Sequence, residues 1–432
     1  MSSPPPAPPE SRRLMSLDAL RGFDMFWILG ADSLVHALHK MSPSAPTTFL
    51  ATELDHAEWQ GFHFYDLIFP LFVFIMGVST VFSLTKIIAR EGRAAAVKRI
   101  LRRGILLFIL GLIYSGGFTY PWPDMRLLGV LNRIALCYTF GGLLFVFLRP
   151  RALVAVAVAL LLGYWAMLGF IPIRDIHLKS DHLAARAEKA GDETLAAEFR
   201  HVSGDPSSNP SAMRDGPVWT AAQKMFLATT NTVNGKFEMG YNLANHFDFE
   251  YLPARLYDAF WDPEGLLSTL PAIATGLLGI FAGLFIQNKS VSDGKKVAWL
   301  LGAGAAGVAL GFLWGLDFPV IKKIWTSSYV LVAGGYSALL LGAFYWVVEV
   351  KQWREWCQPF VWIGMNPITL YMTDNLLDFH SLAIRLAGGP VKGFFDTHVA
   401  AGCGDLFIST AGVALFIGFA RFLYRRKIFL RL

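Results

Sequence analysis

The segment that decides the fold is FYDLIFPLFVFIMGVSTVFSLTKI, residues 64–87. Between Asp66 near its start and Lys86 near its end lie nineteen residues that carry no charge. An α-helix needs about 20 predominantly apolar residues to cross the roughly 30 Å of hydrocarbon in a bilayer. The segment therefore predicts a membrane-spanning helix.

The composition of the whole chain supports a membrane protein. Of 432 residues, 54% are hydrophobic and only 16% are charged, whereas an ordinary globular protein has roughly 25% charged residues. The mean hydropathy of +0.45 excludes a disordered chain, a fibrous repeat protein and a plain cytosolic enzyme. The three cysteines, Cys137, Cys357 and Cys403, are too few and too scattered for a disulfide framework or a CxxC metal site.

Other apolar runs of similar length are spaced along the sequence. We therefore predict an all-α fold, a polytopic membrane bundle of about ten transmembrane helices. The predicted spans lie near residues 17–38, 64–87, 104–120, 127–148, 152–172, 266–287, 297–316, 328–348, 359–378 and 405–424.

Basic residues cluster in alternate connections, and this pattern sets the orientation. The connection after the second span carries seven basic residues and one acid, and both termini fall on the same side as this connection. The positive-inside rule then places both termini in the cytoplasm. Lys322 and Lys323 fall on the outer side, against the rule. The net charge of +6 reflects this membrane topology, so we expect no nucleic-acid partner.

The spans divide the chain into four parts. Residues 1–14 are Pro-rich and predict a disordered cytoplasmic tail. Residues 15–172 hold five spans and an outer, His-containing loop, 39–63. Residues 173–262 form a polar outer segment, too long for a passive connection. Residues 263–432 hold the last five spans and a basic tail.

Polar residues inside the predicted spans need a partner or a function, because charge is expensive in hydrocarbon. Asp32 lies near the outer end of the first span without an evident local partner. Asn132 and Arg133 lie in the fourth span, and Asn366 and Tyr371 lie in the ninth. Such residues line a polar path through a bundle, or they join helices by hydrogen bonds as in many inert bundles.

His56 is the histidine whose surroundings suit proton transfer. It lies between Asp55 and Glu58, and Asp66 follows ten residues later at the start of a span that Pro70 should bend. A neighbouring carboxylate holds an imidazole in one tautomer and favours its use as a base. The pattern alone also allows a loop histidine without function. No GxSxG, HExxH or Walker A motif is present.

Several blocks together resemble a family of transmembrane acetyltransferases, the heparan-α-glucosaminide N-acetyltransferases and their bacterial relatives. His56, Ala57 and Trp59 match the family's H-A-x-W segment, and Asp66, Leu67, Phe69 and Pro70 match its D-L-x-F-P segment. The blocks appear in the order SLDALRGFDMF, DHAEWQGFHFYDLIFPLFVFIMG, GVLNRIALCY, WDPEGLLSTLPAIATGLLGIFAG, KKIWTSSYV and IGMNPITLY, from near residue 16 to residue 371.

The resemblance implies that the protein takes acetyl-CoA from the cytoplasm and acetylates the amine of a glucosamine-type sugar on the outer side. His56 would remove the amine proton, or would itself carry the acetyl group. Asp66 would orient His56 or bind the sugar, and its alternative role is to cap the second span. No metal is implied.

The remaining candidate site residues divide between the acetyl donor and the acceptor. Those expected to hold acetyl-CoA are Arg133, Asn132, Asn366, Tyr371, Arg99 and Arg103, although positive-inside anchoring explains the last two equally well. Those expected to bind the acceptor are Trp59, Asp32, Asn245 and Glu264.

Two other functions remain open at this point. A cell-envelope glycan O-acyltransferase would use the same base, and a polytopic transporter would also need buried polar residues, although no internal repeat supports a transporter. For a bacterial source the expected location is the inner membrane. The resemblance also allows a homodimer.

Overall fold

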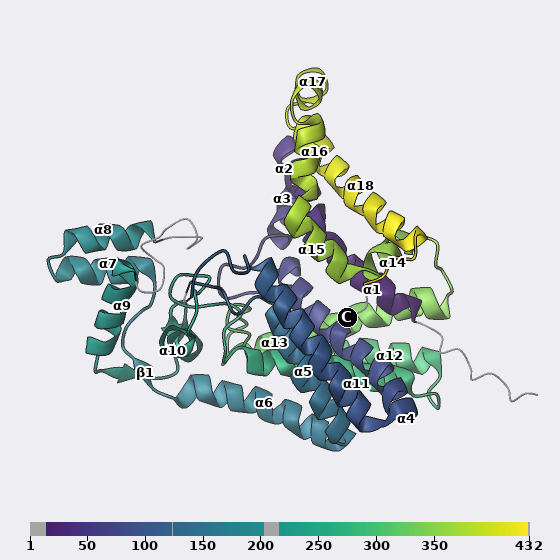
Figure 1. Ribbon diagram of the computed structural model, residues 1–432, viewed down its shortest axis with the longest axis horizontal. Helices are drawn as coiled ribbons and strands as arrows, with labels where there is room; N and C mark the ends of the chain where they lie inside the picture. The colour runs from purple at the N-terminus through teal and green to yellow at the C-terminus, as the bar shows by residue number, and fades with distance from the viewer. Residues whose placement is uncertain (1–13, 123, 203–215, 431–432) are drawn as a thin grey trace, which may run out of the picture.

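The computed structural model describes residues 14–122, 124–202 and 216–430, and Figure 1 shows that regular structure in these ranges is almost entirely helical. The predicted all-α class is confirmed, because the described residues contain only four strands, each two residues long. The predicted tail, residues 1–14, lies outside the described residues except for Leu14, as do the last two residues of the chain.

Among the described residues, seven helices are long and apolar enough to cross a membrane, so the chain is a polytopic membrane protein. They are α4 (Phe64–Tyr114), α5 (Val130–Phe147), α6 (Pro150–Phe170), α11 (Thr269–Gln287), α12 (Asp293–Trp314), α13 (Ser327–Tyr345) with the π-helical turn η4 (Trp346–Val350), and α18 (Cys403–Arg425).

The helix α4 contains the second predicted span, the connection after it and most of the third predicted span, up to Tyr114, in one run of 51 residues. At 1.5 Å per residue this run would measure about 76 Å, far more than one bilayer needs. Gly92 interrupts it, with a φ of 86° that side-chain-bearing residues rarely adopt. Beyond Gly92 the helix packs on α5, with Gly104 against Thr139 and Gly111 against Asn132. The length of α4 thus accommodates the second predicted span and most of the third.

The first and ninth predicted spans are both broken. In the first, α1 (Met15–Phe26) passes through the π-helical turn η1 (Trp27–Ala31), where Gly30 has a φ of 102°, into α2 (Asp32–Met41). In the ninth, α14 (Gln358–Gly364) ends before Asn366 and α15 (Pro367–Leu377) begins after it. A proline disfavours helical backbone in the residue before it, so Pro367 explains the break at Asn366. The number of ten spans stays a prediction.

The contact between α4 and α11 relies on glycine. A Cβ added to Gly77 would lie 2.1 Å from the carbonyl oxygen of Gly276, and one added to Gly279 would lie 2.0 Å from that of Phe74. Membrane helices commonly approach through small residues, since lipid supplies no hydrophobic force between them. The α4–α11 pair is therefore held by close backbone packing, and it anchors the start of α4.

Residues 173–202 and 216–262, here called the polar lobe, form a group of small elements beyond α6 (Figure 1). The lobe has a hydrophobic core of its own, which includes Phe199, Trp219, Phe249 and Phe260. Its antiparallel strand pairs are β1 (Ile173–Arg174) with β2 (Thr232–Val233), and β3 (Phe237–Glu238) with β4 (Tyr241–Asn242). Its helices are α7 (Ser180–Lys189), α8 (Glu193–His201), α9 (Pro217–Ala228) and α10 (Leu243–Tyr251).

A second projection rises from the bundle in Figure 1, where α2 and α16 (Phe379–Ala387) pack against α18. The remaining short helices here are α3 (Ala45–Glu53) and α17 (Pro390–His398).

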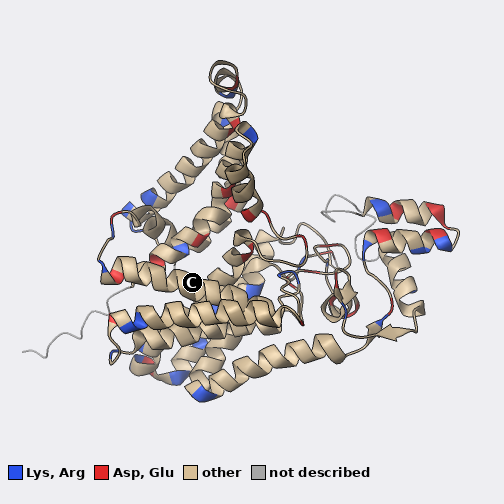
Figure 2. Cartoon of the chain, turned by 180° about the vertical axis from the view of Figure 1, so that it is seen from behind, with Lys and Arg blue, Asp and Glu red and all other residues tan. Residues whose placement is uncertain are grey.

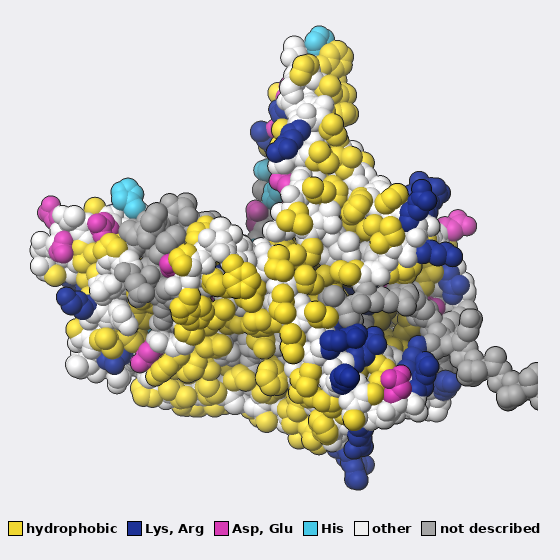
Figure 3. Space-filling model, viewed as in Figure 1, with side chains coloured by type: hydrophobic (Ala, Val, Ile, Leu, Met, Phe, Trp, Pro, Cys, Tyr) yellow, Lys and Arg dark blue, Asp and Glu magenta, His cyan; other side chains and the backbone are white. Residues whose placement is uncertain are grey.

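Charge is distributed unevenly over the bundle. Figure 2 shows few charged residues along the bundle helices, with most charges at helix ends and in the polar lobe. On the face shown in Figure 3, Lys and Arg side chains gather at the end of the bundle that points away from the polar lobe. The exposed basic residues Arg93, Lys98 and Arg102 follow the break in α4 at Gly92. They belong to the basic connection after the second predicted span.

Replacing Gly279 with leucine should disrupt the bundle, because the new side chain would overlap the backbone of α4 at Phe74. We expect a loss of stability on the order of 3 kcal/mol or more, measured as a lower thermal unfolding midpoint in detergent. The matched control is Gly163→Leu on α6, where an added Cβ meets nothing within 4 Å. Equal midpoints for the two variants would contradict the packing argument.

Candidate active site

His56 and Asp66 meet at the start of α4. His56 belongs to the loop between α3 and α4, and Asp66 is in the first turn of α4. The Nδ1 atom of His56 lies 2.9 Å from Oδ1 of Asp66. The Asp66 side chain is completely buried, whereas that of His56 is 47% exposed. The carboxylate thus holds one imidazole nitrogen while the ring faces open space.

The other oxygen of Asp66 fixes the loop that carries His56. Oδ2 accepts hydrogen bonds from the backbone N–H groups of Ala57, at 3.2 Å, and His63, at 3.1 Å. His63 is the N-cap of α4, so Asp66 also satisfies an N–H that a helix start leaves unpaired. The carboxylate therefore defines both ends of the turn between His56 and α4.

Pro70 leaves a backbone carbonyl of α4 without its helical partner. Proline has no N–H, so the carbonyl of Asp66, four residues earlier, cannot form the usual helical hydrogen bond. The hydroxyl of Tyr329 on α13 donates to that carbonyl instead, at 2.7 Å. This hydrogen bond joins α4 to α13 at Asp66, the residue that holds His56.

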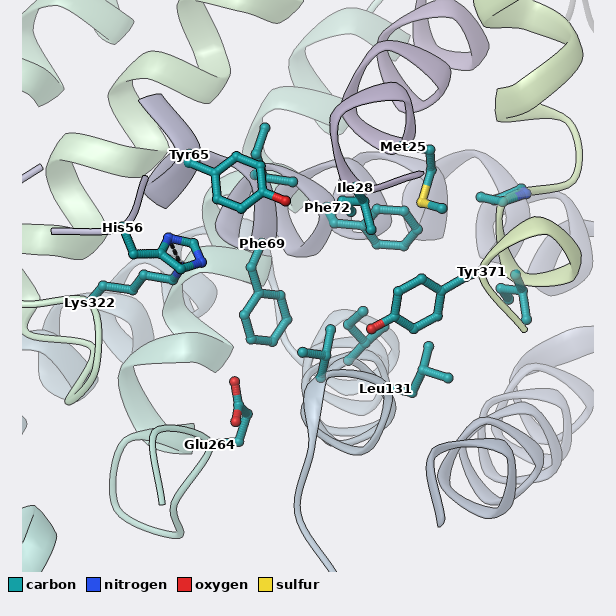
Figure 4. Close-up of a pocket in the computed structure, with 15 residues that line it drawn as sticks. Met25, Ile28, His56, Tyr65, Phe69, Phe72, Leu131, Glu264, Lys322 and Tyr371 are labelled. Carbon is teal, nitrogen blue, oxygen red and sulfur yellow. Dashed lines mark hydrogen bonds between the residues drawn. The ribbon is translucent and has the colours of Figure 1, made fainter. Parts of the chain in front are cut away.

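Lys322 completes the cluster from the connection between α12 and α13. Its Nζ lies 2.9 Å and 3.1 Å from the two ring nitrogens of His56 and 3.4 Å from Oδ1 of Asp66. Figure 4 shows the lysine reaching the imidazole from the side opposite Tyr65. Burial lowers the pKa of Lys322, although the nearby carboxylates of Asp66 and Glu264 oppose this effect.

Backbone pairing holds the two loops together. Gln60 and Ile321 form an isolated antiparallel bridge, and the N–H of Gly61 donates to the carbonyl of Val320 at 3.0 Å. These contacts join segments that are some 260 positions apart in sequence. The position of Lys322 beside His56 is therefore built into the fold.

Two cavities meet at this cluster. The first, here called the apolar cavity, lies between α1, α4, α5 and α15 (Figure 4). It is lined mainly by apolar side chains such as Phe69, Phe72 and Leu131. The second, here called the polar cavity, is lined by six ionisable side chains and Tyr257 together with five apolar residues, two of which, Phe69 and Val130, also line the apolar cavity. Those six are His56, Arg126, Asp258, Glu264, Lys322 and Lys323. His56, Glu264 and Lys322 line both cavities.

An ion-pair network forms one wall of the polar cavity. Arg126 binds Asp262 with two nitrogens, at 3.1 and 3.3 Å, and Glu264 at 2.7 Å. Asp262 also accepts the backbone N–H groups of Tyr257 and Glu264. The two carboxylates raise the pKa of Arg126 against the effect of its burial. This network fixes the WDPEG turn beside His56.

Comparison with known proteins bears directly on this site. Residues 13–178 match the family model described as heparan-alpha-glucosaminide N-acetyltransferase, catalytic, and the match contains both His56 and Asp66. The mouse (Mus musculus) heparan-alpha-glucosaminide N-acetyltransferase is 27% identical over 345 residues, which are 75% of this chain and 49% of the mouse protein. The predicted resemblance is confirmed.

The human (Homo sapiens) protein of the same name is 27% identical over 397 residues, which are 87% of this chain and 55% of the human protein. The chain thus spans about half the length of the curated relatives that it matches. The similarity extends well beyond the segment matched by the family model.

The other residues predicted for the donor site fall into two groups. Tyr371 lines the apolar cavity and stacks on Tyr114, with ring centroids 4.3 Å apart. Arg133, Asn132 and Asn366 are buried and line neither cavity. Arg133 donates to Ser268 and Gly265 and lies over the ring of Trp325.

Asn132 donates to the carbonyl of Phe108 at 2.9 Å, so it joins α5 to α4. Among the described residues the amide of Asn366 has no hydrogen-bond partner. Arg99 and Arg103 lie in the second half of α4, outside both cavities, and the Arg103 guanidinium lies over the ring of Tyr138.

Of the residues predicted for the acceptor side, Glu264 alone lines the polar cavity. The Trp59 indole donates to the carbonyl of Phe237 at 2.7 Å, which joins the His56 loop to the polar lobe. Asn245 accepts from the N–H of Gly240 and the side chain of Asn242 within the lobe. Asp32 lines a different cavity, together with Lys40 and Asp405.

Sequence reasoning missed Lys322, Arg126 and Asp258. For Lys322 a signal existed, because Lys322 and Lys323 fall on the outer side in the orientation predicted from the other basic residues, against the positive-inside rule. A basic residue that stands against the topology rule has another reason for its position, and here that reason is the contact with Asp66. Among the described residues, no group of three or more His, Cys, Asp or Glu side chains is arranged to hold a metal ion.

Removing the Asp66 carboxylate should loosen the loop that carries His56. In Asp66→Ala, the N–H groups of Ala57 and His63 lose their acceptor, so their hydrogen exchange should become at least tenfold faster. Asp66→Asn retains one oxygen for these N–H groups and should exchange more slowly than the alanine variant. Unchanged exchange in Asp66→Ala, measured by mass spectrometry of peptides covering 55–63, would contradict this role.

Proposed function

We propose that the protein is a membrane N-acetyltransferase that moves the acetyl group of acetyl-CoA to the amine of a glucosamine-type sugar. The observation that carries this proposal is the His56–Asp66 pair at the junction of two unlike cavities, within the segment that matches a catalytic family model. The names of the curated relatives supply the reaction class and the kind of acceptor.

The apolar cavity suits the acyl end of the donor. A thioester and its short alkyl arm carry no charge, so aromatic and aliphatic walls such as Phe69, Phe72 and Leu131 accept them without an unpaired polar group. The cavity extends from His56 between the helices of the bundle, past Met25 on α1, to Tyr371 on α15. We propose that the donor enters along this path and places its carbonyl beside His56.

The polar cavity suits the acceptor. A sugar presents hydroxyl groups that need hydrogen-bond partners when water is removed. The six ionisable side chains of this cavity provide acceptors and donors, and an aromatic residue, Tyr257, stands among them. We propose that the sugar binds here, with its amine directed to His56.

The hydrogen-bond partners of His56 fit general base catalysis. When Nδ1–H donates to Asp66, Nε2 carries the lone pair that can take the amine proton. The amine nitrogen then attacks the thioester carbonyl, the C–N bond forms, the C–S bond breaks, and the CoA thiolate leaves. In the alternative route Nε2 itself attacks the thioester and passes the acetyl group to the amine in a second step.

Lys322 has the position of an electrophilic helper. In the transition state the thioester oxygen gains negative charge, which a nearby cation stabilises in a site that excludes water. The Lys322 ammonium is already within 3.1 Å of His56 Nε2 and lines both cavities. We propose that it moves to the carbonyl oxygen when the acceptor amine takes its place beside Nε2.

His56→Ala should abolish acetyl transfer, because no other imidazole lines either cavity in the part of the chain that the structure describes. We expect turnover to fall by a factor of about 10² to 10⁴, measured as CoA release from acetyl-CoA with a panel of amino sugars. His63→Ala, an N-cap outside both cavities, serves as the matched control. Acetyl-CoA binding should persist in both variants. Near-normal turnover in His56→Ala would contradict the catalytic role of His56.

The orientation of the bundle is a further part of the proposal, with the polar lobe and His56 on the outer side of the membrane. Single cysteines introduced at the exposed positions 56 and 223 should react with a membrane-impermeant thiol reagent outside sealed vesicles, once Cys137, Cys357 and Cys403 are replaced. A cysteine at position 289 should react only after the vesicles are opened. Any exchange of these accessibilities would overturn the orientation.

A further inference from the structure

Asp258 presents an unsatisfied carboxylate to the polar cavity. It lies in the connection between α10 and α11 and lines the same cavity as His56. Its Oδ2 atom is buried and has no hydrogen-bond partner among the described residues. A buried carboxylate oxygen without a donor costs stability, and such groups are rare in folded proteins. A ligand that brings a donor into the cavity would remove this cost.

The backbone around Asp258 holds the carboxylate in place. The N–H of Asp258 donates to the carbonyl of Trp261 at 3.0 Å, and the N–H of Phe260 donates back to the carbonyl of Asp258 at 2.7 Å. Between them Ala259 adopts a φ of 64°, a left-handed conformation that costs a residue with a Cβ about 1 kcal/mol or more. The neighbouring ion pair of Arg126 with Asp262 fixes the rest of the turn.

The charges that face Asp258 leave it without an ion pair. Arg126 is bound to Asp262 and Glu264, Lys322 contacts Asp66 and His56, and the Lys323 ammonium lies 5.7 Å from the ring centre of Trp261. No ion pair joins Asp258 to any of these cations in the described ranges. Burial raises the pKa of Asp258 to about 6 and Asp262 adds to the rise, while Lys323 and Arg126 partly oppose it.

We infer that Asp258 is the residue that recognises the acceptor sugar, by accepting hydrogen bonds from ring hydroxyl groups while the amine is held at His56. This inference rests on the proposed function and adds a specificity-determining residue to it. A carboxylate beside the amine itself would favour the ammonium form, which has no lone pair for attack. The hydroxyl groups are therefore the donors that suit Asp258.

The test compares kinetics on glucosamine and on its analogues lacking the 3-, 4- or 6-hydroxyl group. Asp258→Asn should raise KM for glucosamine about 10- to 100-fold, the usual effect of losing a hydrogen bond to a charged group. KM for acetyl-CoA should stay within about twofold of wild type. One deoxy analogue should be a poor acceptor for wild type and should be no worse than glucosamine for the variant.

Glu250→Gln is the matched control, since Glu250 is an exposed acid on α10 outside both cavities. An unchanged KM for glucosamine in Asp258→Asn, or an equal rise in Glu250→Gln, would overturn the inference. If wild type acetylates amino sugars and Asp258→Asn has an unchanged KM for glucosamine, the role of Asp258 is refuted but the proposed function stands. Wild-type protein that binds acetyl-CoA but acetylates no amino sugar would instead refute the proposed function.

A stability measurement tests the same residue without activity. Because the pKa of Asp258 in the fold lies above its usual range, ionisation costs stability at pH values above about 6 and costs nothing below pH 4. The unfolding midpoint of Asp258→Asn should therefore exceed that of wild type at pH 8, and the difference should vanish near pH 4. An asparagine variant that is less stable at pH 8 would show that the carboxylate is a structural group.

Discussion

The buried carboxylate of Asp66 is the constraint on which the site depends. A completely buried charge is tolerated only if every lone pair finds a partner. Asp66 finds four, in the His56 ring, the Lys322 ammonium and two backbone N–H groups. The four partners come from three parts of the site, so satisfying one carboxylate fixes the His56 loop, the start of α4 and the connection before α13 together.

This arrangement also explains why the two cavities differ. The apolar cavity is bounded by helices of the bundle, where unpaired polar groups are costly, and its walls are consequently apolar. The polar cavity is lined mainly by residues of connections, where Arg126 pairs with Asp262 and Lys322 pairs with Asp66. His56 stands where the two cavities meet. The uncharged thioester end of the donor and a hydroxylated acceptor can each be desolvated on its own side of the imidazole.

The fold could be predicted from the sequence to the extent that it depends on length and polarity. Apolar runs near 20 residues identified the helices α4, α5, α6, α11, α12, α13 and α18 as membrane-spanning. The break at Gly30 was not predicted, because a run of apolar residues has the same appearance whether its backbone is continuous or not, whereas Pro367 was a signal for the break at Asn366 that length and polarity alone do not use. Likewise, the helical connection through Gly92 was read as a loop from its charges alone.

The site could be predicted where its partners are close in sequence. His56 and Asp66 are ten residues apart, and the chain between them is a single turn around the carboxylate. Lys322 is 266 residues from His56, so only the fold brings them together. Arg133, Asn132 and Asn366 are buried but line neither cavity, because the direction in which a side chain points depends on the rotation of its helix, which polarity alone does not specify.

The irregular segments of the first and ninth predicted spans lie at the apolar cavity. Both broken spans line the apolar cavity, through Met25 and Ile28 near η1 and through Pro367, Ile368 and Tyr371 on α15. Near these breaks, Asp24 and Asn366 are buried without hydrogen-bond partners among the described residues. In the bilayer, irregular backbone persists where it lines a cavity. The two breaks therefore lie along the path proposed for the donor, as Asp258 lies at the place proposed for the acceptor.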